Sequence, residues 1–171
     1  MSLTLQDFAA RVHGILQSNN TPAGRTQVAA LLADALKDRG FIDSVFDQDT
    51  PERKVVYEDP QLGFCILAHR YTDARDSGPH DHGPSWAIYG QADGETVMSD
   101  WVRVDPASTE KRAKVAKVRE YKLAPGVAHV YNEGDVHAPS RAGPTRLVRI
   151  EGINLEGVRR GSYEAVASPP A

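Results

Sequence analysis

Hydrophobic residues recur at intervals of three and four positions along the first forty residues of the chain. The two stripes consist of Leu5, Phe8, Val12, Ile15 and Leu16, and of Val28, Leu31, Leu32, Ala35 and Leu36. Thr4 with Asp7 resembles a helix-capping start, Thr21 and Pro22 suit a second helix N-terminus, and Gly40 suits its end. The pattern predicts two helices within a segment covering residues 1–42.

After Gly40 the hydrophobic period changes to two. Short β-rich runs alternate with Gly, Pro, Asp and Asn: KVVYED, FCILAHRY, SWAIYGQ, ETVMSDWVRV, AKVREYKL, AHVYN, RLVRIEGI and SYEAV. Helix-length segments for parallel crossovers are absent from this part of the sequence, which favours an antiparallel sandwich or barrel. The sequence therefore predicts a mainly β domain over residues 43–166 and a frayed tail over residues 167–171.

Composition narrows the class of protein. The chain has 171 residues, of which 40% are hydrophobic, and this is enough for one domain with a sizeable core. A formal net charge of −3 favours neither nucleic acid nor an anionic membrane as partner and leaves a small molecule as the default ligand. Cys65 is the only cysteine, so no intrachain disulfide is expected, and no apolar stretch has membrane-spanning length. We expect a cytoplasmic protein.

The stretch GPHDHGPSWAIYG, residues 78–90, contains the main candidate for chemistry. In a strand, residues i and i+2 point to the same face, so His80 and His82 can aim both imidazoles at one point. A metal site needs a third ligand from elsewhere. His137 follows the turn residues Gly134 and Asp135 and leads into a short extended segment, which makes it the best candidate among the remaining histidines.

The H-x-H stretch resembles the first motif of the cupin superfamily, in which a glycine, two histidines, an acidic ligand and a second glycine follow at set spacings. Gly94 closes the motif at the expected distance from His82, and Ala87 occupies the place of the acidic ligand. The second cupin motif is matched by Gly126, Gly134 and His137, with Asn132 replacing the usual proline and Arg141 the usual asparagine.

This resemblance implies a cupin fold, a double-stranded β-helix or jelly-roll barrel, here with two N-terminal α-helices. It also implies a metal bound by His80, His82 and His137. Without the acidic ligand the chain is most similar to three-histidine cupins such as cysteine dioxygenase and related thiol dioxygenases. It departs from them where Arg149 and Glu151 occupy the expected places of a histidine and a tyrosine, and it has no cysteine near Ala87 for a crosslink.

Three neutral imidazoles leave about half of an octahedral shell open, which suits Fe(II) with a chelating substrate and dioxygen. They also suit Zn(II) with a bound water, and Ni(II) is a further option by affinity alone. The family resemblance and the expected compartment favour iron. The alternatives are a non-redox zinc-type hydrolase or isomerase, and a non-catalytic cupin that binds a metal and senses a ligand.

An anionic substrate needs a cation nearby. Alternation along RLVRIEG places Arg149 and Glu151 on one strand face: inward they bind the anion and act as an acid/base group, whereas outward they form a surface pair of little energetic value. Arg53 resembles the position from which cysteine dioxygenases hold the substrate carboxylate, although the spacing differs by one residue. An exposed arginine at a strand start is the other interpretation.

Two further strands contribute candidate pocket residues. Cys65, Leu67, His69 and Tyr71 share one face, so His69 is either a proton-transfer group or a buried structural histidine, and Tyr71 resembles an aromatic residue that lines the substrate site. Tyr89 shares parity with Ala87 and can offer its hydroxyl to bound oxygen or substrate. By analogy with other cupins, a homodimer is expected.

Overall fold

The computed structural model describes residues 2–105 and 112–167. Three helices occur within these ranges: α1 (Leu5–Ser18), α2 (Pro22–Ala35) and α3 (Arg39–Val45). The described strands are β1 (Lys54–Glu58), β2 (Cys65–Tyr71), β3 (Arg75–Asp76), β4 (Ala87–Asp93), β5 (Thr96–Arg103), β6 (Ala113–Leu123), β7 (Ala128–Tyr131), β8 (Val136–Arg141), β9 (Thr145–Glu151) and β10 (Tyr163–Val166).

The helix boundaries agree with the sequence at their N-termini and differ at one C-terminus. Thr4 and Asp7 form the expected capping box of α1, and Thr21 and Pro22 begin α2. Gly40 does not end α2; it lies inside α3, whose N-cap Asp38 accepts a hydrogen bond from the Gly40 amide. The prediction of only two helices is therefore wrong, because seven residues with one capping side chain are too short for periodicity to reveal.

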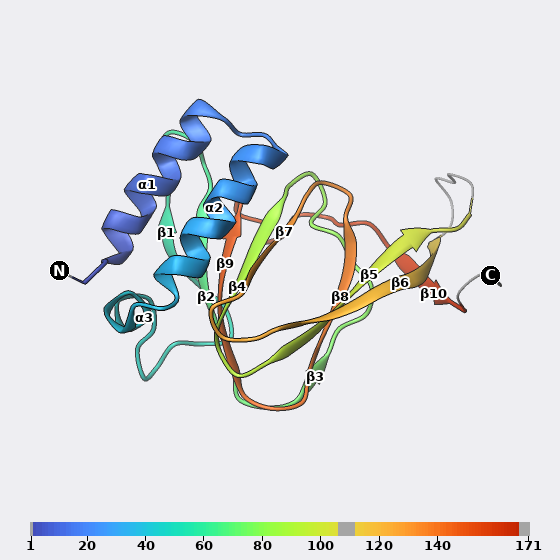
Figure 1. Cartoon of the computed structure of the whole chain (residues 1–171). Helices are drawn as coiled ribbons and strands as arrows, with labels where there is room; N and C mark the ends of the chain where they lie inside the picture. Colours follow the sequence, from blue (N-terminus) through green and yellow to red (C-terminus); the bar gives the residue numbers. More distant parts are fainter. Residues whose placement is uncertain (1, 106–111, 168–171) are drawn as a thin grey trace.

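The described strands form two five-stranded sheets that face each other, in the orders β1-β2-β9-β4-β7 and β10-β6-β5-β8-β3. Helices cover the outer face of the first sheet, and the second sheet lies on the opposite side of the barrel (Figure 1). This jelly-roll arrangement confirms the predicted fold class. One detail differs from the antiparallel sandwich or barrel that the sequence favoured: β10 pairs with β6 in parallel.

Alternation along the central strands divides the first sheet into two buried faces. Val148 and Ile150 of β9 belong to the core shared with the helices, together with Ile66, Ile88 and Trp86. The intervening residues of β9 point into the barrel. Their neighbours in register are Leu67 and Tyr89 beside Arg149, and Cys65 and Ala87 beside Glu151.

Helix α2 approaches the first sheet closely at Gly90. A Cβ atom at that position would lie 2.6 Å from Leu32 Cδ2 and 2.7 Å from Leu36 Cδ1. Since these distances are far below normal van der Waals contact, a larger residue at this position would force the buried Leu32 and Leu36 side chains to move. The helical layer is therefore an integral part of the barrel's core.

Replacing Leu32 with alanine tests this interpretation. The side chain is fully buried between α2 and the sheet, so we expect its truncation to lower the free energy of unfolding by about 2–5 kcal/mol. Urea unfolding followed by circular dichroism measures the change. Leu62→Ala is the matched control, because Leu62 is 37% exposed and its truncation leaves no cavity. Equal losses for the two variants would contradict the packing of α2 on the barrel.

Candidate metal centre

Backbone pairing brings His80 next to His137. His80 lies in an isolated bridge opposite His137 of β8, with hydrogen bonds from the His80 amide to the His137 carbonyl (3.0 Å) and in the reverse direction (2.9 Å). Residues 81–86 then leave the strand conformation. His80 and His82 therefore do not share a regular strand face as predicted. The chain turns at Gly83, with φ 59°, and the His82 side chain is fully buried.

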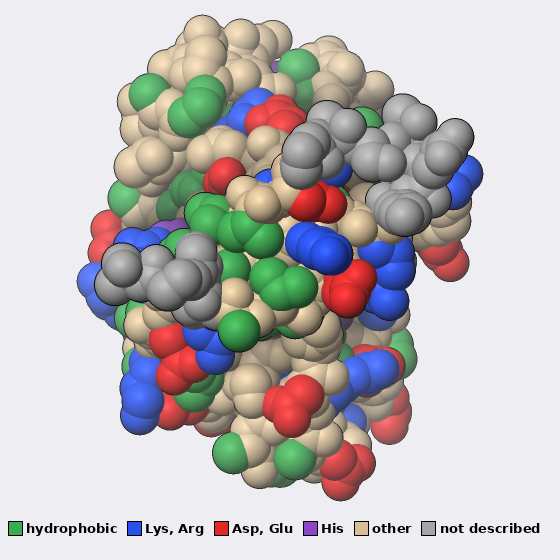
Figure 2. Space-filling view, turned by 90° about the vertical axis from the view of Figure 1, so that its right-hand side faces the viewer, with side chains coloured by type: hydrophobic (Ala, Val, Ile, Leu, Met, Phe, Trp, Pro, Cys, Tyr) green, Lys and Arg blue, Asp and Glu red, His purple; other side chains and the backbone are tan. Residues whose placement is uncertain are grey.

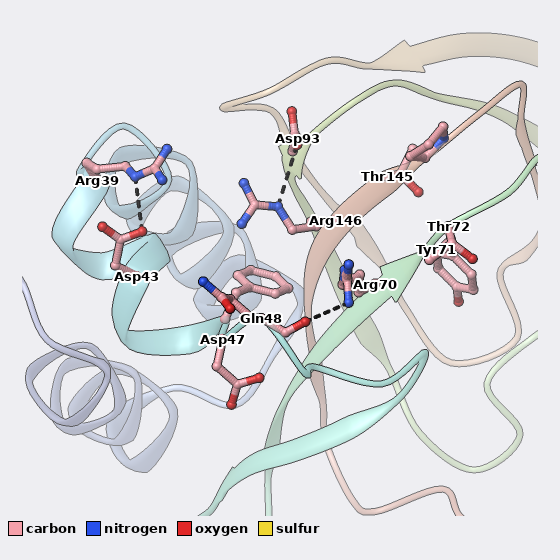
Figure 3. A pocket seen from close by; sticks show the side chains of 12 residues that line it. Arg39, Asp43, Asp47, Gln48, Arg70, Tyr71, Thr72, Asp93, Thr145 and Arg146 are labelled. Atoms are coloured by element: carbon pink, nitrogen blue, oxygen red, sulfur yellow. Dashed lines mark hydrogen bonds and ion pairs between the residues drawn. The ribbon is translucent and has the colours of Figure 1, made fainter.

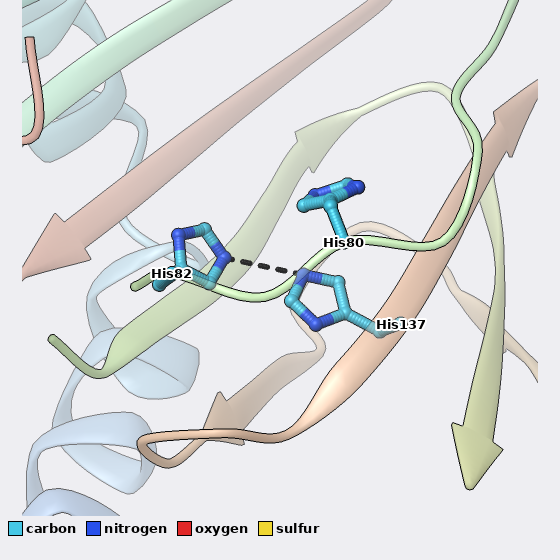
Figure 4. Close-up of side chains that lie close together, drawn as sticks. All are labelled: His80, His82 and His137. Atoms are coloured by element: carbon cyan, nitrogen blue, oxygen red, sulfur yellow. Dashed lines mark hydrogen bonds between the residues drawn. The ribbon is translucent and has the colours of Figure 1, made fainter. Parts of the chain in front are cut away.

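The three imidazoles nevertheless converge (Figure 4). One nitrogen from each of His80, His82 and His137 can be chosen so that all lie within 4.8 Å of one another. The Nε2 atoms of His82 and His137 are 3.2 Å apart. His82 and His137 are fully buried, whereas His80 is partly exposed. The predicted ligand set is thus brought together by the fold.

Hydrogen bonds to the backbone orient two of the rings. His80 Nδ1 is 2.9 Å from the Gly78 carbonyl oxygen, and His137 Nδ1 is 3.1 Å from that of Asp135. A carbonyl can only accept, so both Nδ1 atoms carry the proton and both Nε2 atoms keep a lone pair. This is how outer hydrogen bonds orient histidine ligands in metal sites.

All three imidazoles are neutral near pH 7. Burial lowers the pKa of each, and the positive charge of nearby Arg149 lowers it further; the pKa of His80 falls to about 4. Neutral, convergent imidazoles can bind a transition metal ion or Zn(II), whereas Mg²⁺ and Ca²⁺ prefer oxygen ligands. The residues therefore fit a mononuclear metal bound by three histidines.

Tyr89 lies beside the ligands. Its hydroxyl oxygen is 3.0 Å from His82 Nε2 and 3.4 Å from His137 Nε2. Burial raises the pKa of this hydroxyl, so it stays protonated and can donate a hydrogen bond. Ala87, two residues earlier on the same face, is a buried apolar residue, so no acidic ligand occupies this position.

A chain of polar aromatic contacts supports His137 from the other side. The Tyr131 ring stacks on the His137 ring at 4.0 Å between centroids, and its hydroxyl is 2.7 Å from that of Tyr121. Tyr121 in turn donates to Asp100 Oδ1 at 2.9 Å. Sequence reasoning missed this support, because the three residues lie on different strands and nothing in their local pattern links them.

Arg149 and Glu151 of β9 both point into the barrel. The Arg149 guanidinium carbon is 4.4 Å from the Tyr89 ring centroid, and its Nη1 donates to Glu151 Oε1 at 3.3 Å. Glu151 Oε2 lies 3.7 Å from Arg53 Nη2. Burial opposes the charged form of Arg149, but Tyr89 and Glu151 outweigh it and raise its pKa. The arginine is thus a permanent cation close to the histidines.

A cavity of about 370 Å³ opens beside His80. Its other lining residues are mostly basic or aromatic: Arg53, Arg75, Arg141, Arg149, Arg160, His69 and Tyr71, with Glu52, Ser77, Gly78 and Pro139. The structure therefore brings Arg53, Arg149, His69 and Tyr71 to one cavity. Sequence analysis gave no role to Arg75, Arg141 or Arg160. The signal that could have identified them is the number of arginines in the segments that flank the two histidine motifs.

His69 presents a free nitrogen on this side of the barrel. Its Nδ1 donates to the Glu52 carbonyl oxygen at 2.9 Å and lies 3.3 Å from the Tyr71 hydroxyl. Its Nε2 is buried and has no hydrogen-bond partner among the described residues. Burial lowers the pKa of His69 well below its usual value, so the ring stays neutral and Nε2 carries a lone pair that can accept a hydrogen bond.

A larger groove of about 700 Å³ lies between α3 and the first sheet, and its charged side chains already have partners within the protein, most of them inside the groove (Figure 3). Arg39 pairs with Asp43, Arg146 with Asp93, and Arg70 donates to the Gln48 carbonyl. On the face formed by β5, β6 and β10, acidic and basic side chains are interspersed with apolar ones (Figure 2). The cavity beside His80 is therefore the better candidate site.

In the described ranges, no helix combines the length and the apolar character needed to cross a bilayer. No protein-family model matches the sequence, and no curated protein matches it either. The similar solved structures include KdgF from Halomonas sp., at 16% identity over 58% of this chain and 74% of that one, with a TM-score of 0.44.

Two others are cupin proteins by description. The match to a cupin superfamily protein from Desulfitobacterium hafniense has 14% identity over 60% of this chain and 76% of that one, with a TM-score of 0.41. The match to a cupin-2 domain protein from Shewanella frigidimarina has 15% identity over 64% and 86%, with a TM-score of 0.42. Identities and TM-scores this low support no conclusion about the site, so the candidate metal centre rests on the geometry of this chain's own residues.

Proposed function

We propose that the chain is a mononuclear non-haem Fe(II) dioxygenase that acts on a small anionic substrate, with small thiols as the first class to test. The observation that carries the proposal is that three neutral histidines meet where an arginine-lined cavity reaches His80. An Fe(II) ion bound there would supply the open coordination positions and the redox chemistry that dioxygen requires.

The chain's own residues supply binding and proton transfer. Arg149 is charged and buried and can hold an anionic group of the substrate through paired hydrogen bonds. Glu151, between Arg149 and Arg53, holds the Arg149 guanidinium in place and can act as an acid/base group. Arg53 and Tyr71 line the same cavity and complete the wall against which the substrate binds.

Two groups are placed to form hydrogen bonds with a bound substrate or ligand. The protonated Tyr89 hydroxyl, 3.0 Å from His82 Nε2, can donate a hydrogen bond to a ligand held at the three histidines. His69 Nε2 is buried without a partner in the described part of the chain and can accept a hydrogen bond, such as that of a thiol. Burial excludes water and strengthens both interactions.

The proposal is tested with protein loaded with Fe(II) without oxygen and then mixed with small carboxylate-bearing thiols in an oxygen electrode. We expect substrate-dependent oxygen uptake, and for Arg149→Leu a KM raised by about tenfold or more with unchanged iron content. Arg146→Leu, which alters the opposite face of β9, is the control. Turnover that persists without oxygen would instead indicate zinc-type hydrolysis or isomerisation, and ligand binding without product would indicate a sensing module.

A further inference from the structure

Arg141, at the end of β8, lines the cavity and is only 2% exposed. Its Nε and Nη2 atoms are buried and make no hydrogen bond within the part of the chain that the structure describes. The guanidinium carbon lies 4.3 Å from the Tyr71 ring centroid, which supplies a cation–π contact but no negative charge. A buried arginine remains protonated, so this charge calls for an anionic partner.

Other arginines of the cavity already have carboxylate partners. Arg75 pairs with Glu52, and Arg149 donates to Glu151, whose second oxygen lies 3.7 Å from Arg53. Within the described ranges, these carboxylates are therefore engaged by other arginines, and the charge of Arg141 stays without an acidic partner. A bound ligand can provide the missing partner.

Arg141 and Arg149 reach the cavity from opposite sheets. Arg149 is on β9 of the sheet covered by the helices, whereas Arg141 is on β8 of the other sheet. We propose that the cavity binds a small molecule with two acidic groups at separate positions, one held by Arg149 and the other by Arg141. The assignment of the first group rests on the proposed function, whereas the second rests on the unpaired guanidinium alone.

The volume and the chemistry agree with this ligand class. About 370 Å³ is within the range of small-molecule sites. A planar guanidinium binds a carboxylate through two parallel hydrogen bonds, so each acid position can be held directionally. A ligand whose single acidic group binds Arg149 would leave Arg141 buried and unpaired. Because a buried polar group without a partner costs binding free energy, the site should bind such a ligand more weakly than one with two acidic groups.

The test is isothermal titration calorimetry on the full chain, with and without bound metal. The diacids malonate, succinate and glutarate are compared with propionate, butyrate and valerate, which match them in length but have one acidic group. We expect at least one diacid to bind about tenfold or more tightly than its monoacid. Arg141→Gln should abolish this preference, whereas Arg70→Gln, outside the cavity, should retain it.

Three results would overturn the proposal: no preference for any diacid, a preference that survives in Arg141→Gln, or tighter binding of ethyl phosphate, in which both charges sit on one group. If Arg141→Gln does not fold, Arg141→Lys carries the test, with a reduced preference expected because a lysine cannot bind bidentately. Diacid preference without oxygen uptake would refute only the dioxygenase proposal, and oxygen uptake without diacid preference would refute only the two-acid ligand.

Discussion

Replacing His82 with alanine is expected to remove the metal and, with it, all oxygen-dependent turnover. The side chain is fully buried, and its Nε2 lies 3.2 Å from His137 Nε2, at the centre of the three-histidine cluster. Loss of an outer hydrogen-bond partner costs a metal site about 10- to 100-fold in affinity, and loss of a ligand costs more. The two histidines left can bind a metal only weakly.

Metal content per chain, measured by mass spectrometry after iron loading and desalting, checks this prediction. We expect about one iron per chain in the wild-type protein and less than about a tenth of that in His82→Ala. His129→Ala is the matched control, because His129 packs against Tyr121 and Tyr131 but does not belong to the cluster. Equal metal content in wild type and His82→Ala would refute the ligand assignment.

Acid is expected to destabilise the metal-free protein steeply below about pH 6.5. Burial lowers the folded-state pKa of His69, His80, His82 and His137, and the pKa of His80 falls to about 4. The unfolded chain therefore binds more protons than the folded chain between the folded-state values and about pH 6.5. Stability is complete above that window and declines as the pH falls through it.

Each of these histidines contributes a slope of up to about 1.4 kcal/mol per pH unit, so the four together contribute up to about 5.5 kcal/mol per unit. Urea unfolding of metal-free protein at pH 8, 7, 6 and 5 measures the dependence. His69→Phe should lower the slope by up to about 1.4 kcal/mol per pH unit, since one proton-binding group is removed. A free energy of unfolding that stays constant from pH 7 to 5 would show that these imidazoles are not buried and neutral.

Arg149 links the two halves of the candidate site. Its charge adds to burial in lowering the pKa of all three histidine ligands, and its guanidinium also lines the cavity. The same cation therefore adds to burial in keeping the ligands neutral and also attracts an anion. An anionic ligand would offset part of this effect, which makes ligand binding and metal binding electrostatically dependent on each other.

Local signals in the sequence were sufficient for much of the architecture. The capping residues of α1 and α2, the change of hydrophobic period after Gly40 and most strands follow from patterns within a few residues, because capping and face alternation are local physical effects. The pairing of His80 and His82 with His137 also came from sequence motifs. Helix α3 was missed because a single capping side chain and seven residues leave too weak a pattern.

Only the tertiary structure decided which strand faces line the barrel. From the sequence, the side chains of Arg149 and Glu151 could point either into the barrel or out of it. Both faces of β9 are buried, so the alternation of residues along the strand does not show which face points inward. Helices cover Val148 and Ile150, and this turns the charged pair inward. The unpaired Arg141 and the Tyr131 support of His137 depend on contacts across strands distant in sequence, which local patterns do not encode.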